Sequence, residues 1–380
     1  MHIGLNATCF NDRPSGARQR FVGLYGTLIR QCPDIRFTVY EPSDCAVARW
    51  FDAAPNISAI RTPLPSGSRW RRSVGGIAYW PKRLREDRID LLENFNLPLP
   101  PTGDCPVVVT IHDIRSTLPD QPWPQRILAG AIHRQALRRA SAVLTVSETM
   151  RRELLAIDPE ARVIVIPNGL ATDAFAAQSG DDQRALALGL PDEYLLAVGH
   201  FEPRKNYRRL VEAIGRLRAA HPRLSLVIVG NDGGSLSDLR TGIGELGMAD
   251  AVQLRQNVTD DELRVIYRHS RLILFPSTYE GFGIPILEAM AAGRPLVVSD
   301  LPVFRELIGV RGAYFPPQDV TKMADAIAAV LVSPKRQREL IDDGGNRVGD
   351  FNFVRLAAAV EPVYRDVLTQ RHASADGGRS

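Results

Sequence analysis

The chain has 380 residues, of which 44% are hydrophobic and 24% are charged. A chain of this length exceeds one ordinary hydrophobic core, so we expect two domains of about 150 to 200 residues each. The composition excludes an intrinsically disordered protein, while a net charge of +4 and a pI near 9.0 favour anionic ligands only weakly.

The cysteines and the apolar runs limit the cellular context. Cys9, Cys32, Cys45 and Cys105 show neither CxxC spacing nor nearby paired histidines, which predicts reduced thiols rather than a zinc site or a disulfide framework. No apolar run approaches the ~18 to 20 residues of a membrane span, and the first residues do not have the pattern of a signal peptide. We therefore expect a cytoplasmic protein, or a peripheral one on the inner membrane face.

Short β-branched runs alternate with helical stretches along the whole chain. In the first half the runs are residues 1–7, 36–42, 90–95, 106–113, 141–148 and 162–169. In the second half they are residues 194–200, 224–231, 251–256, 271–277 and 295–300. Strands that alternate with helices form parallel sheets, so the predicted fold class is α/β with two doubly wound, Rossmann-like domains.

The division into domains follows from an interruption of this rhythm. Residues 168–193 are small and polar, which places the linker near 175–190 and the domains at 1–180 and 190–350. A last helical pattern at 351–370 precedes a predicted disordered tail at 371–380. Because doubly wound sheets bind ligands beyond the carboxyl ends of their strands, the loops that follow strands are the candidates for a site in a cleft between the domains.

Several strand ends in the first half carry candidate residues. Gly16 opens a helix in a turn that resembles a phosphate-binding loop but lacks the full glycine pattern. His112 and Asp113 follow a buried strand, where a lone histidine is more often a structural residue than a catalyst. Ser147 and Asn168 follow later strands, with structural turns as the alternative explanation.

In the second half, a strand that ends at Gly199 leads through Arg204 and Lys205 into an amphipathic helix. The helix dipole disfavours cations at a helix N-terminus unless an anion lies between them and the free amides. A diphosphate would be such an anion. A solvated basic loop on a surface helix is the alternative.

The stretch TYEGFGIPILEAMAAGRP, residues 278–295, places Glu280 and Glu288 on either side of a Gly-Phe-Gly step. Gly281 and Gly283 allow a ligand to approach the backbone closely, and the proline that follows suits the first position of a helix. Glu288, in the first turn or just beyond, either complements the helix dipole or accepts hydrogen bonds from a ribose diol. On spacing alone both explanations stay open.

Together these stretches resemble the retaining glycosyltransferases of family 4, of the mannosyl- and rhamnosyltransferase type that builds bacterial surface polysaccharides. The resemblance covers nearly the whole chain. It rests on the Gly16 loop, HD at 112–113, VSE at 146–148, IPNG at 166–169, VGHFEPRKN at 198–206, VGN at 229–231 and FPSTYEGFGIPILEAMAAGRPLVVSD at 275–300. It implies the GT-B architecture, with an inter-domain cleft and a C-terminal helix that returns to the N-terminal domain.

The resemblance implies roles for the candidate residues. Glu288 would hold the ribose hydroxyls of a nucleotide-diphosphate sugar, Glu280 would lie beside the donor sugar, and His112 would contact that sugar near the reacting carbon. The cations would bind the diphosphate, assisted by backbone amides. The implied catalytic residues are His112, Arg204, Lys205 and Glu280, and the implied donor-binding residues are Gly16, Asn168, His200, Arg204, Lys205, Glu280, Gly281, Phe282, Gly283, Ile284 and Glu288.

His200 is a departure, because some family members carry arginine directly after the strand glycine. Phosphate binding would then depend more on Arg204 and Lys205, and His200 would add charge at lower pH. No DxD motif stands at a matching loop, so we expect transfer without a metal ion or a cofactor. The resemblance further implies retention of the anomeric configuration through front-side attack.

The sequence therefore predicts a hexosyltransferase that moves mannose, rhamnose or glucose from a nucleotide-diphosphate donor to a glycan or lipid-linked acceptor in polysaccharide or lipopolysaccharide biosynthesis. Residues 69–87, RWRRSVGGIAYWPKRLRED, suit either an anionic lipid surface or a solvated helix face. One alternative is another nucleotide-sugar enzyme, such as an epimerase. A nucleic-acid-binding module has only the pI in its favour, because the chain carries no recognisable reader motif.

Overall fold

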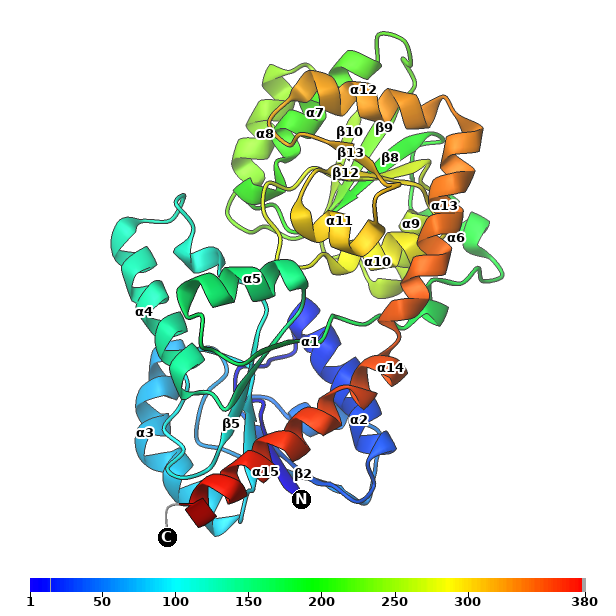
Figure 1. The fold of residues 1–380 in the computed structure, drawn as a ribbon. Coiled ribbons are helices and arrows are strands. Elements are labelled where there is room, and N and C mark those ends of the chain that lie inside the picture. Colours follow the sequence, from blue (N-terminus) through cyan, green and yellow to red (C-terminus); the bar gives the residue numbers. More distant parts are fainter. Residues whose placement is uncertain (14, 378–380) are drawn as a thin grey trace. The chain divides into compact units, whose positions relative to one another are not determined.

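The computed structural model describes residues 1–13 and 15–377, which form two compact units. Unit 1 comprises residues 1–169 together with the C-terminal segment that begins at Phe353, and unit 2 comprises residues 170–352. The chain therefore passes from one unit to the other twice (Figure 1).

Among the described residues of unit 1, seven strands form a parallel sheet in the order β3-β2-β1-β4-β5-β6-β7. The strands are β1 (His2–Asn6), β2 (Arg36–Glu41), β3 (Ile57–Arg61), β4 (Leu91–Asn94), β5 (Val107–Ile111), β6 (Ala142–Thr145) and β7 (Val163–Val165). The sequence pattern does not predict β3. This edge strand is partly exposed, so it lacks the continuous apolar run of the central strands.

Helices cover both faces of this sheet (Figure 1). Their bounds are α1 (Gly16–Arg20), α2 (Gly26–Gln31), α3 (Arg69–Glu86), α4 (Trp123–Arg139), α5 (Glu148–Ile157), α14 (Phe353–Ala358) and α15 (Val360–Gly377). A π-helical turn, η1 (Phe21–Tyr25), joins α1 to α2, and short 3-10 turns lie at η2 (Val47–Trp50) and η3 (Arg115–Thr117). On one face, apolar residues of α2 and α15 share a core with β1 and β2; on the other face, Trp80 and Leu84 of α3 pack near Leu92 of β4.

In unit 2, the described residues hold six parallel strands in the order β10-β9-β8-β11-β12-β13. The strands are β8 (Tyr194–Val198), β9 (Ser225–Val229), β10 (Val252–Arg255), β11 (Leu272–Phe275), β12 (Leu296–Ser299) and β13 (Ala313–Phe315). The pattern predicts each of them except β13, whose three residues are too few to show a periodicity. Both sheets confirm the predicted α/β fold class with two doubly wound halves.

The helices of unit 2 also lie on both faces of their sheet (Figure 1). Their bounds are α6 (Asp181–Ala187), α7 (Tyr207–Leu217), α8 (Leu236–Glu245), α9 (Asp260–His269), α10 (Ile284–Ala291), α11 (Pro302–Ile308), α12 (Val320–Leu331) and α13 (Pro334–Val348), with 3-10 turns at η4 (Thr172–Phe175), η5 (Pro203–Lys205) and η6 (Gly349–Phe351). Apolar residues of α7, α8 and α12 form one core with the strands. This core holds the loops that follow β8 and β11 in fixed positions.

The segment at 175–190, where the sequence predicts a linker, includes residues that pack into unit 2. Phe175 lies edge-on to Tyr267 with ring centroids 5.8 Å apart, and Asp181 pairs with Arg264 at 2.7 Å. The small and polar residues that interrupt the strand rhythm therefore include groups that are buried in unit 2.

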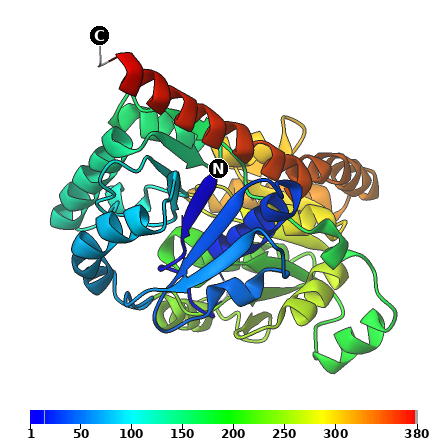
Figure 2. The ribbon, with the colours of Figure 1, turned by 90° about the horizontal axis from the view of Figure 1, so that it is seen from below.

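The C-terminal helix returns to unit 1, as the fold class predicts. Tyr364 of α15 is fully buried and donates a hydrogen bond to Glu93 of β4, which also accepts one from Tyr25. Figure 2 shows α15 lying across unit 1, near the first strand. The helix runs to Gly377, beyond the end at residue 370 that the sequence predicts, and residues 378–380 lie outside the described part of the chain.

The described helices include none that is long and apolar enough to cross a bilayer. Cys9, Cys32, Cys45 and Cys105 are all free thiols, in agreement with the spacing argument. Burial raises the pKa of Cys9 to about 12, so this thiol stays protonated at neutral pH.

Candidate functional site

Two loops at the carboxyl edge of the unit 2 sheet form the most charged part of the candidate site. Their strands, β8 and β11, are neighbours, so the loops lie side by side. The Thr278 amide donates to the Arg204 carbonyl at 2.8 Å, and the buried Asn206 side chain donates to the carbonyls of Pro276 and Pro317 at 3.0 and 2.7 Å. Asn206 adopts a left-handed backbone with φ of 58°, a conformation that asparagine tolerates. These bonds fix the positions of the adjacent cations.

Glu280 is ion-paired with both of these cations. Its Oε1 accepts from Lys205 Nζ at 2.7 Å, and its Oε2 lies 2.8 Å from Arg204 Nη1. Arg204 Nε also donates to Glu202 at 2.7 Å, and Ser277 Oγ donates to Glu280 at 2.9 Å. The resemblance assigns Glu280 to the donor sugar and the cations to the diphosphate. The structure adds an ion pair of this carboxylate with both cations, because the two loops are hydrogen-bonded to each other.

The electrostatics of this cluster favour the charged forms of Glu280 and Arg204. Burial opposes the charge on Glu280, but Lys205 and Arg204 outweigh it and lower the pKa of the carboxyl. Burial likewise disfavours the Arg204 cation, yet Glu280 and Glu202 raise the pKa of the guanidinium. The formal charges of Glu202, Arg204, Lys205 and Glu280 sum to zero. An anionic ligand would therefore meet N–H donors that are already oriented, but no excess of side-chain charge.

Lys205 reaches Glu280 across a glycine. A Cβ atom on Gly199 would lie 2.8 Å from Lys205 Nζ, and the backbone there has a φ of 146° that favours glycine. Gly230 on β9's loop approaches the Gly199 carbonyl so closely that its own Cβ would fall 2.0 Å away. The missing Cβ of Gly199 thus leaves the space that the lysine side chain fills, and the missing Cβ of Gly230 lets the two backbones approach each other.

The Gly-Phe-Gly step forms the turn that starts α10. Gly283 has a φ of 122° and precedes Ile284, the first residue of the helix, so the helix begins where the sequence predicts it. Phe282 is buried, with its ring 5.9 Å from that of Phe351. Its side chain therefore anchors the turn, which leaves Phe282 only its backbone to offer a ligand.

Glu288 lies in the second turn of α10 and is only 9% exposed. It accepts a hydrogen bond from the Tyr267 hydroxyl at 2.8 Å. Burial raises the pKa of Glu288 to about 7, although the Tyr267 hydrogen bond partly opposes the shift. This carboxyl is poised between its protonated and ionised forms at neutral pH.

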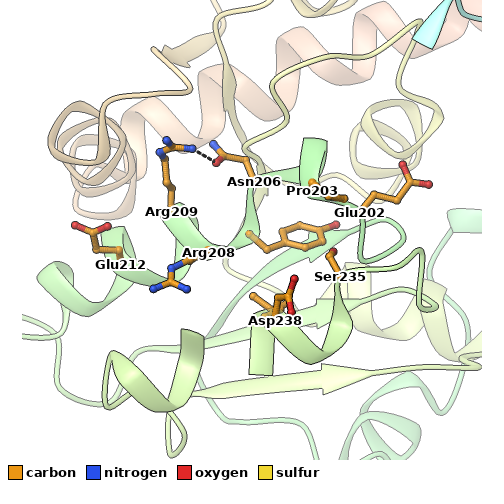
Figure 3. Close-up of a pocket in the computed structure, with 10 residues that line it drawn as sticks. Glu202, Pro203, Asn206, Arg208, Arg209, Glu212, Ser235 and Asp238 are labelled. Carbon is orange, nitrogen blue, oxygen red and sulfur yellow. Dashed lines mark hydrogen bonds between the residues drawn. The ribbon is translucent and has the colours of Figure 1, made fainter. Parts of the chain in front are cut away.

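His200 follows the β8 strand but lies apart from the ion cluster. Its side chain is exposed, and Nδ1 accepts a hydrogen bond from the Asn231 amide at 3.3 Å. Beside this loop, a cavity of about 430 Å³ opens between α7 and α8 (Figure 3). Glu202, Asn206 and Arg209 line it, with Arg209 donating to Asn206 at 3.0 Å, but Arg204, Lys205 and Glu280 do not. Of the four charged residues of the ion cluster, Glu202 is therefore the one that lines this cavity.

In unit 1, His112 follows β5 and is half-buried. Burial, and secondarily the Arg20 guanidinium, lower the pKa of His112 to about 3, so its imidazole is neutral at pH 7. Asp113 is exposed and accepts from the Arg115 amide at 3.1 Å, which is a local turn contact. Neighbouring in sequence, His112 and Asp113 thus have separate surroundings.

The remaining candidates of unit 1 have structural contacts. Gly16 is the exposed first residue of α1, where Ser15 caps the helix by accepting from the Arg18 amide at 3.2 Å. Asn168 is buried and accepts from Arg20 Nη1 at 3.3 Å. Ser147, whose turn was the alternative explanation, is the N-cap of α5.

Sequence reasoning missed three residues that contact the site. Ser277 bonds Glu280, and its place directly after β11 was a usable signal. Tyr267 bonds Glu288 from α9, where an amphipathic helix gives no hint of such a role. Arg20 is buried beside the Asn168 loop, although arginine in a helix normally suggests an exposed position. Among the described residues, no group of three or more histidine, cysteine or carboxylate side chains gathers to hold a metal ion.

Two family models match the chain in succession. Residues 28–174 match the model described as Glycosyltransferase Family 4, and residues 179–347 match the one described as Glycosyl transferases group 1. The second match contains the ion cluster and Glu288, and the first contains His112 and Asn168.

Relatives and solved structures agree with these matches. The chain is 30% identical to the MMP alpha-(1->4)-mannosyltransferase of Mycolicibacterium hassiacum, over 63% of this chain and 57% of the relative. It is 27% identical to the O-antigen chain mannosyltransferase RfbU of Salmonella typhimurium, over 66% of this chain and 67% of the relative. The fold is similar to that of sucrose-phosphate synthase from Thermosynechococcus elongatus, with a TM-score of 0.78, 20% identity and 97% and 99% of the two chains covered. Anabaena HepE in complex with UDP-glucose gives a TM-score of 0.73 at 18% identity, with 96% and 99% covered.

Proposed function

We propose that the chain transfers a hexosyl or deoxyhexosyl group from a nucleotide-diphosphate sugar to a glycan or lipid-linked acceptor. Two glycosyltransferase family models that match it in succession support this proposal. The observation that carries the proposal is the cluster at the carboxyl edge of unit 2. There Arg204 and Lys205 are held by Glu280, next to a glycine turn that opens α10. Such an arrangement suits a diphosphate.

The roles divide among the residues of unit 2. The cations and the amides of the 281–284 turn stabilise the charge that develops on the leaving diphosphate. Glu280 orients both cations and lies beside the donor sugar. Glu288 in its ionised form accepts hydrogen bonds from the ribose diol.

The proposed reaction retains the anomeric configuration. The bond between the anomeric carbon and the diphosphate oxygen breaks, and the acceptor hydroxyl oxygen bonds to the same face of that carbon. The hydroxyl proton passes to the departing diphosphate oxygen, which balances the step. The neutral imidazole of His112 contributes a hydrogen bond near the reacting carbon. Stabilisation of the leaving group by fixed cations makes the proposed transfer independent of metal ions and cofactors.

Mannose, rhamnose or glucose is the proposed sugar, and bacterial surface polysaccharide or lipopolysaccharide is the proposed product. The support comes from relatives named as an O-antigen chain mannosyltransferase and as an MMP mannosyltransferase. The curated names support transfer rather than epimerisation, so the epimerase alternative is not favoured. The two matched domains also give no reason to propose a nucleic-acid partner.

We also propose a cytoplasmic protein that contacts an anionic inner-leaflet surface through α3. The side chain of Trp70 is 73% exposed beside Arg69 and Arg71, which combines an interfacial aromatic with positive charge. Binding to vesicles that contain anionic lipid should weaken when Arg69 and Arg71 are replaced by glutamine, and it should weaken with added salt. Salt-independent binding, or binding unchanged in this variant, would contradict the lipid contact.

A thermal-shift screen of GDP-, UDP- and dTDP-sugars tests the donor assignment. A donor at 100 times its dissociation constant adds about 2.7 kcal/mol to the free energy of unfolding. We expect one nucleotide class to stabilise the wild type and to lose that effect in Lys205→Met and Glu288→Ala. If no nucleotide sugar stabilises the chain, the proposed function is wrong.

A further inference from the structure

A second cavity, of about 260 Å³, lies at the carboxyl edge of the unit 1 sheet. Asn6 ends β1, and Thr8 and Asn96 follow β1 and β4, so three of its lining residues come directly from strand ends. β4 is the neighbour of β5, whose carboxyl end leads into His112. The cavity and His112 thus belong to the same edge of the sheet, where doubly wound folds bind their ligands.

The floor of the cavity is polar but uncharged. Thr8 Oγ1 donates to Asn6 Oδ1 at 2.7 Å, and Asn6 Nδ2 donates to Asn94 Oδ1 at 2.5 Å. Asn94 in turn donates to the Asn96 carbonyl. Asn96 Oδ1 is buried and has no donor among the described residues. Because an unsatisfied buried acceptor is costly, this oxygen is suited to accept a hydrogen bond from a ligand hydroxyl.

One side of the cavity is positively charged. Arg72 lines it, its Nη1 donates to the Pro65 carbonyl at 3.3 Å, and its Nε is buried without an acceptor in the described part of the chain. Arg69 and Arg71 add exposed charge on the same helix. Of the residues described as lining this cavity, none is acidic. The cavity therefore favours an anionic group beside the hydroxyls.

An apolar stripe of exposed side chains on α3 begins in the cavity and continues outside it. Trp70, Val74 and Ile77 are spaced four and three residues apart, so they share one face of α3. Their side chains are 73%, 47% and 61% exposed, and Val74 and Ile77 also line the cavity. The same face is therefore half inside the cavity and half in solvent, which is an unusual position for three large apolar groups.

We propose that this cavity is the acceptor site and that it takes an amphiphile: a hydroxylated head group, an anionic linker and an apolar chain. The head group lies over Thr8 and Asn96, the linker lies beside Arg72, and the chain lies along Trp70, Val74 and Ile77. Because the polar floor and the apolar stripe belong to one cavity, we assign the stripe to the apolar chain of the same acceptor. This inference rests on the proposed glycosyltransferase function and specifies its acceptor.

Three probes test the proposal on the full chain: decyl α-mannosyl phosphate below its micellar concentration, the chainless mannose 1-phosphate, and decyl phosphate. Calorimetric titration should show the first probe binding at least about tenfold more tightly than either of the others, because head and chain contribute together. Ile77→Asn should reduce binding of the two decyl probes about tenfold and leave mannose 1-phosphate unchanged. Asn96→Ala should weaken the two mannosyl probes and leave decyl phosphate unchanged.

Trp123 of α4 provides the matched control, since it is 71% exposed in the same unit and does not line the cavity. Trp123→Ala should leave all three affinities unchanged. Equal weakening in Trp123→Ala and Ile77→Asn would mean unspecific adsorption of the decyl chain and would overturn the proposal. So would the absence of any gain from the decyl chain. The nucleotide-sugar thermal shift, run on the same variants, separates the cases: a donor response without amphiphile binding refutes only the acceptor inference.

Discussion

Glu280 and Glu288 lie within one short stretch of unit 2, yet their surroundings are opposite. Glu280 is held by two cations, which lower the pKa of its carboxyl. Glu288 accepts a hydrogen bond from the Tyr267 hydroxyl, and burial raises the pKa of Glu288 to about 7. The two carboxyls are similarly buried, yet Glu280 keeps its charge whereas the charge of Glu288 depends on pH. The difference arises because Glu280 has cationic partners that outweigh desolvation and Glu288 has a neutral one.

The difference separates two tasks. A carboxylate that orients cations has to stay ionised over the working pH range, and Glu280 does so. In the ligand-free protein a neutral carboxyl is less costly to bury than a carboxylate. Glu288 can therefore be protonated without ligand and ionise when a ribose diol binds to it. The two glutamates should consequently respond differently to substitution and to pH.

The largest effect is expected for Lys205→Met, which removes one of the two cations from Glu280. Leaving the buried carboxylate with Arg204 alone should lower the free energy of unfolding by about 3 kcal/mol and reduce transfer about 100-fold or more. Urea unfolding and initial rates measure the two quantities. Lys322→Met is the control, since Lys322 is an exposed lysine 3.9 Å from Asp319. Equal losses in both variants would argue against the ion cluster.

Glu288→Gln should change how stability depends on pH. The folded pKa of about 7 lies above the ordinary 4.5, so the folded state binds the proton more tightly. The free energy of unfolding of the wild type should therefore fall by about 3 kcal/mol as the pH rises from 4.5 to 7, and glutamine should abolish this fall. Chemical unfolding across that range tests it, with Glu245→Gln as the exposed control. A wild type whose stability does not fall would refute the buried neutral form.

Tyr267→Phe removes the side chain that, among the described residues, donates a hydrogen bond to Glu288. The loss should be about 2 kcal/mol at pH 8, where the hydrogen bond acts on a charged carboxylate, and about 1 kcal/mol at pH 5. The pKa of Glu288 should rise further, which NMR titration of the carboxyl can follow. Tyr314→Phe, at a partly buried tyrosine of unit 2 whose hydroxyl donates to the Gly309 carbonyl, controls for loss of a hydroxyl.

The smallest effect is expected for Ser277→Ala. Ser277 donates to Glu280, but the two cations remain, so we expect a loss of about 1 kcal/mol that is the same at pH 5 and pH 8. Unfolding curves at the two pH values suffice. A pH-dependent loss as large as that of Tyr267→Phe would show that the two carboxyls are more alike than their contacts indicate.

The sequence predicts most of the strands and the helix that follows Gly283, because buried parallel strands and a glycine-proline turn leave strong local patterns. It does not predict that Glu280 pairs with Arg204 and Lys205. That contact joins residues 75 positions apart, and it depends on β8 and β11 being neighbours in the sheet. For the same reason, the partner of Glu288 could not be identified from its own stretch.

The sequence also does not predict which polar side chains are buried. Arg20 and Glu93 are polar, and sequence reasoning would place such residues at the surface, but both are buried in unit 1. Glu93 accepts from Tyr25 and Tyr364, which come from opposite ends of the chain. The two tyrosines meet at Glu93 because α15 returns to unit 1, and no short segment of the sequence contains that information.

The return of α15 also has a consequence for synthesis. Unit 2 is one continuous segment, whereas the core of unit 1 is completed by Leu356, Val360 and Tyr364 at the end of the chain. On a ribosome, unit 2 can therefore finish folding while unit 1, although it emerges first, still lacks its last helix. Unit 1 is thus begun before unit 2 and completed after it, so a chaperone would meet an open apolar face on unit 1 until α15 emerges.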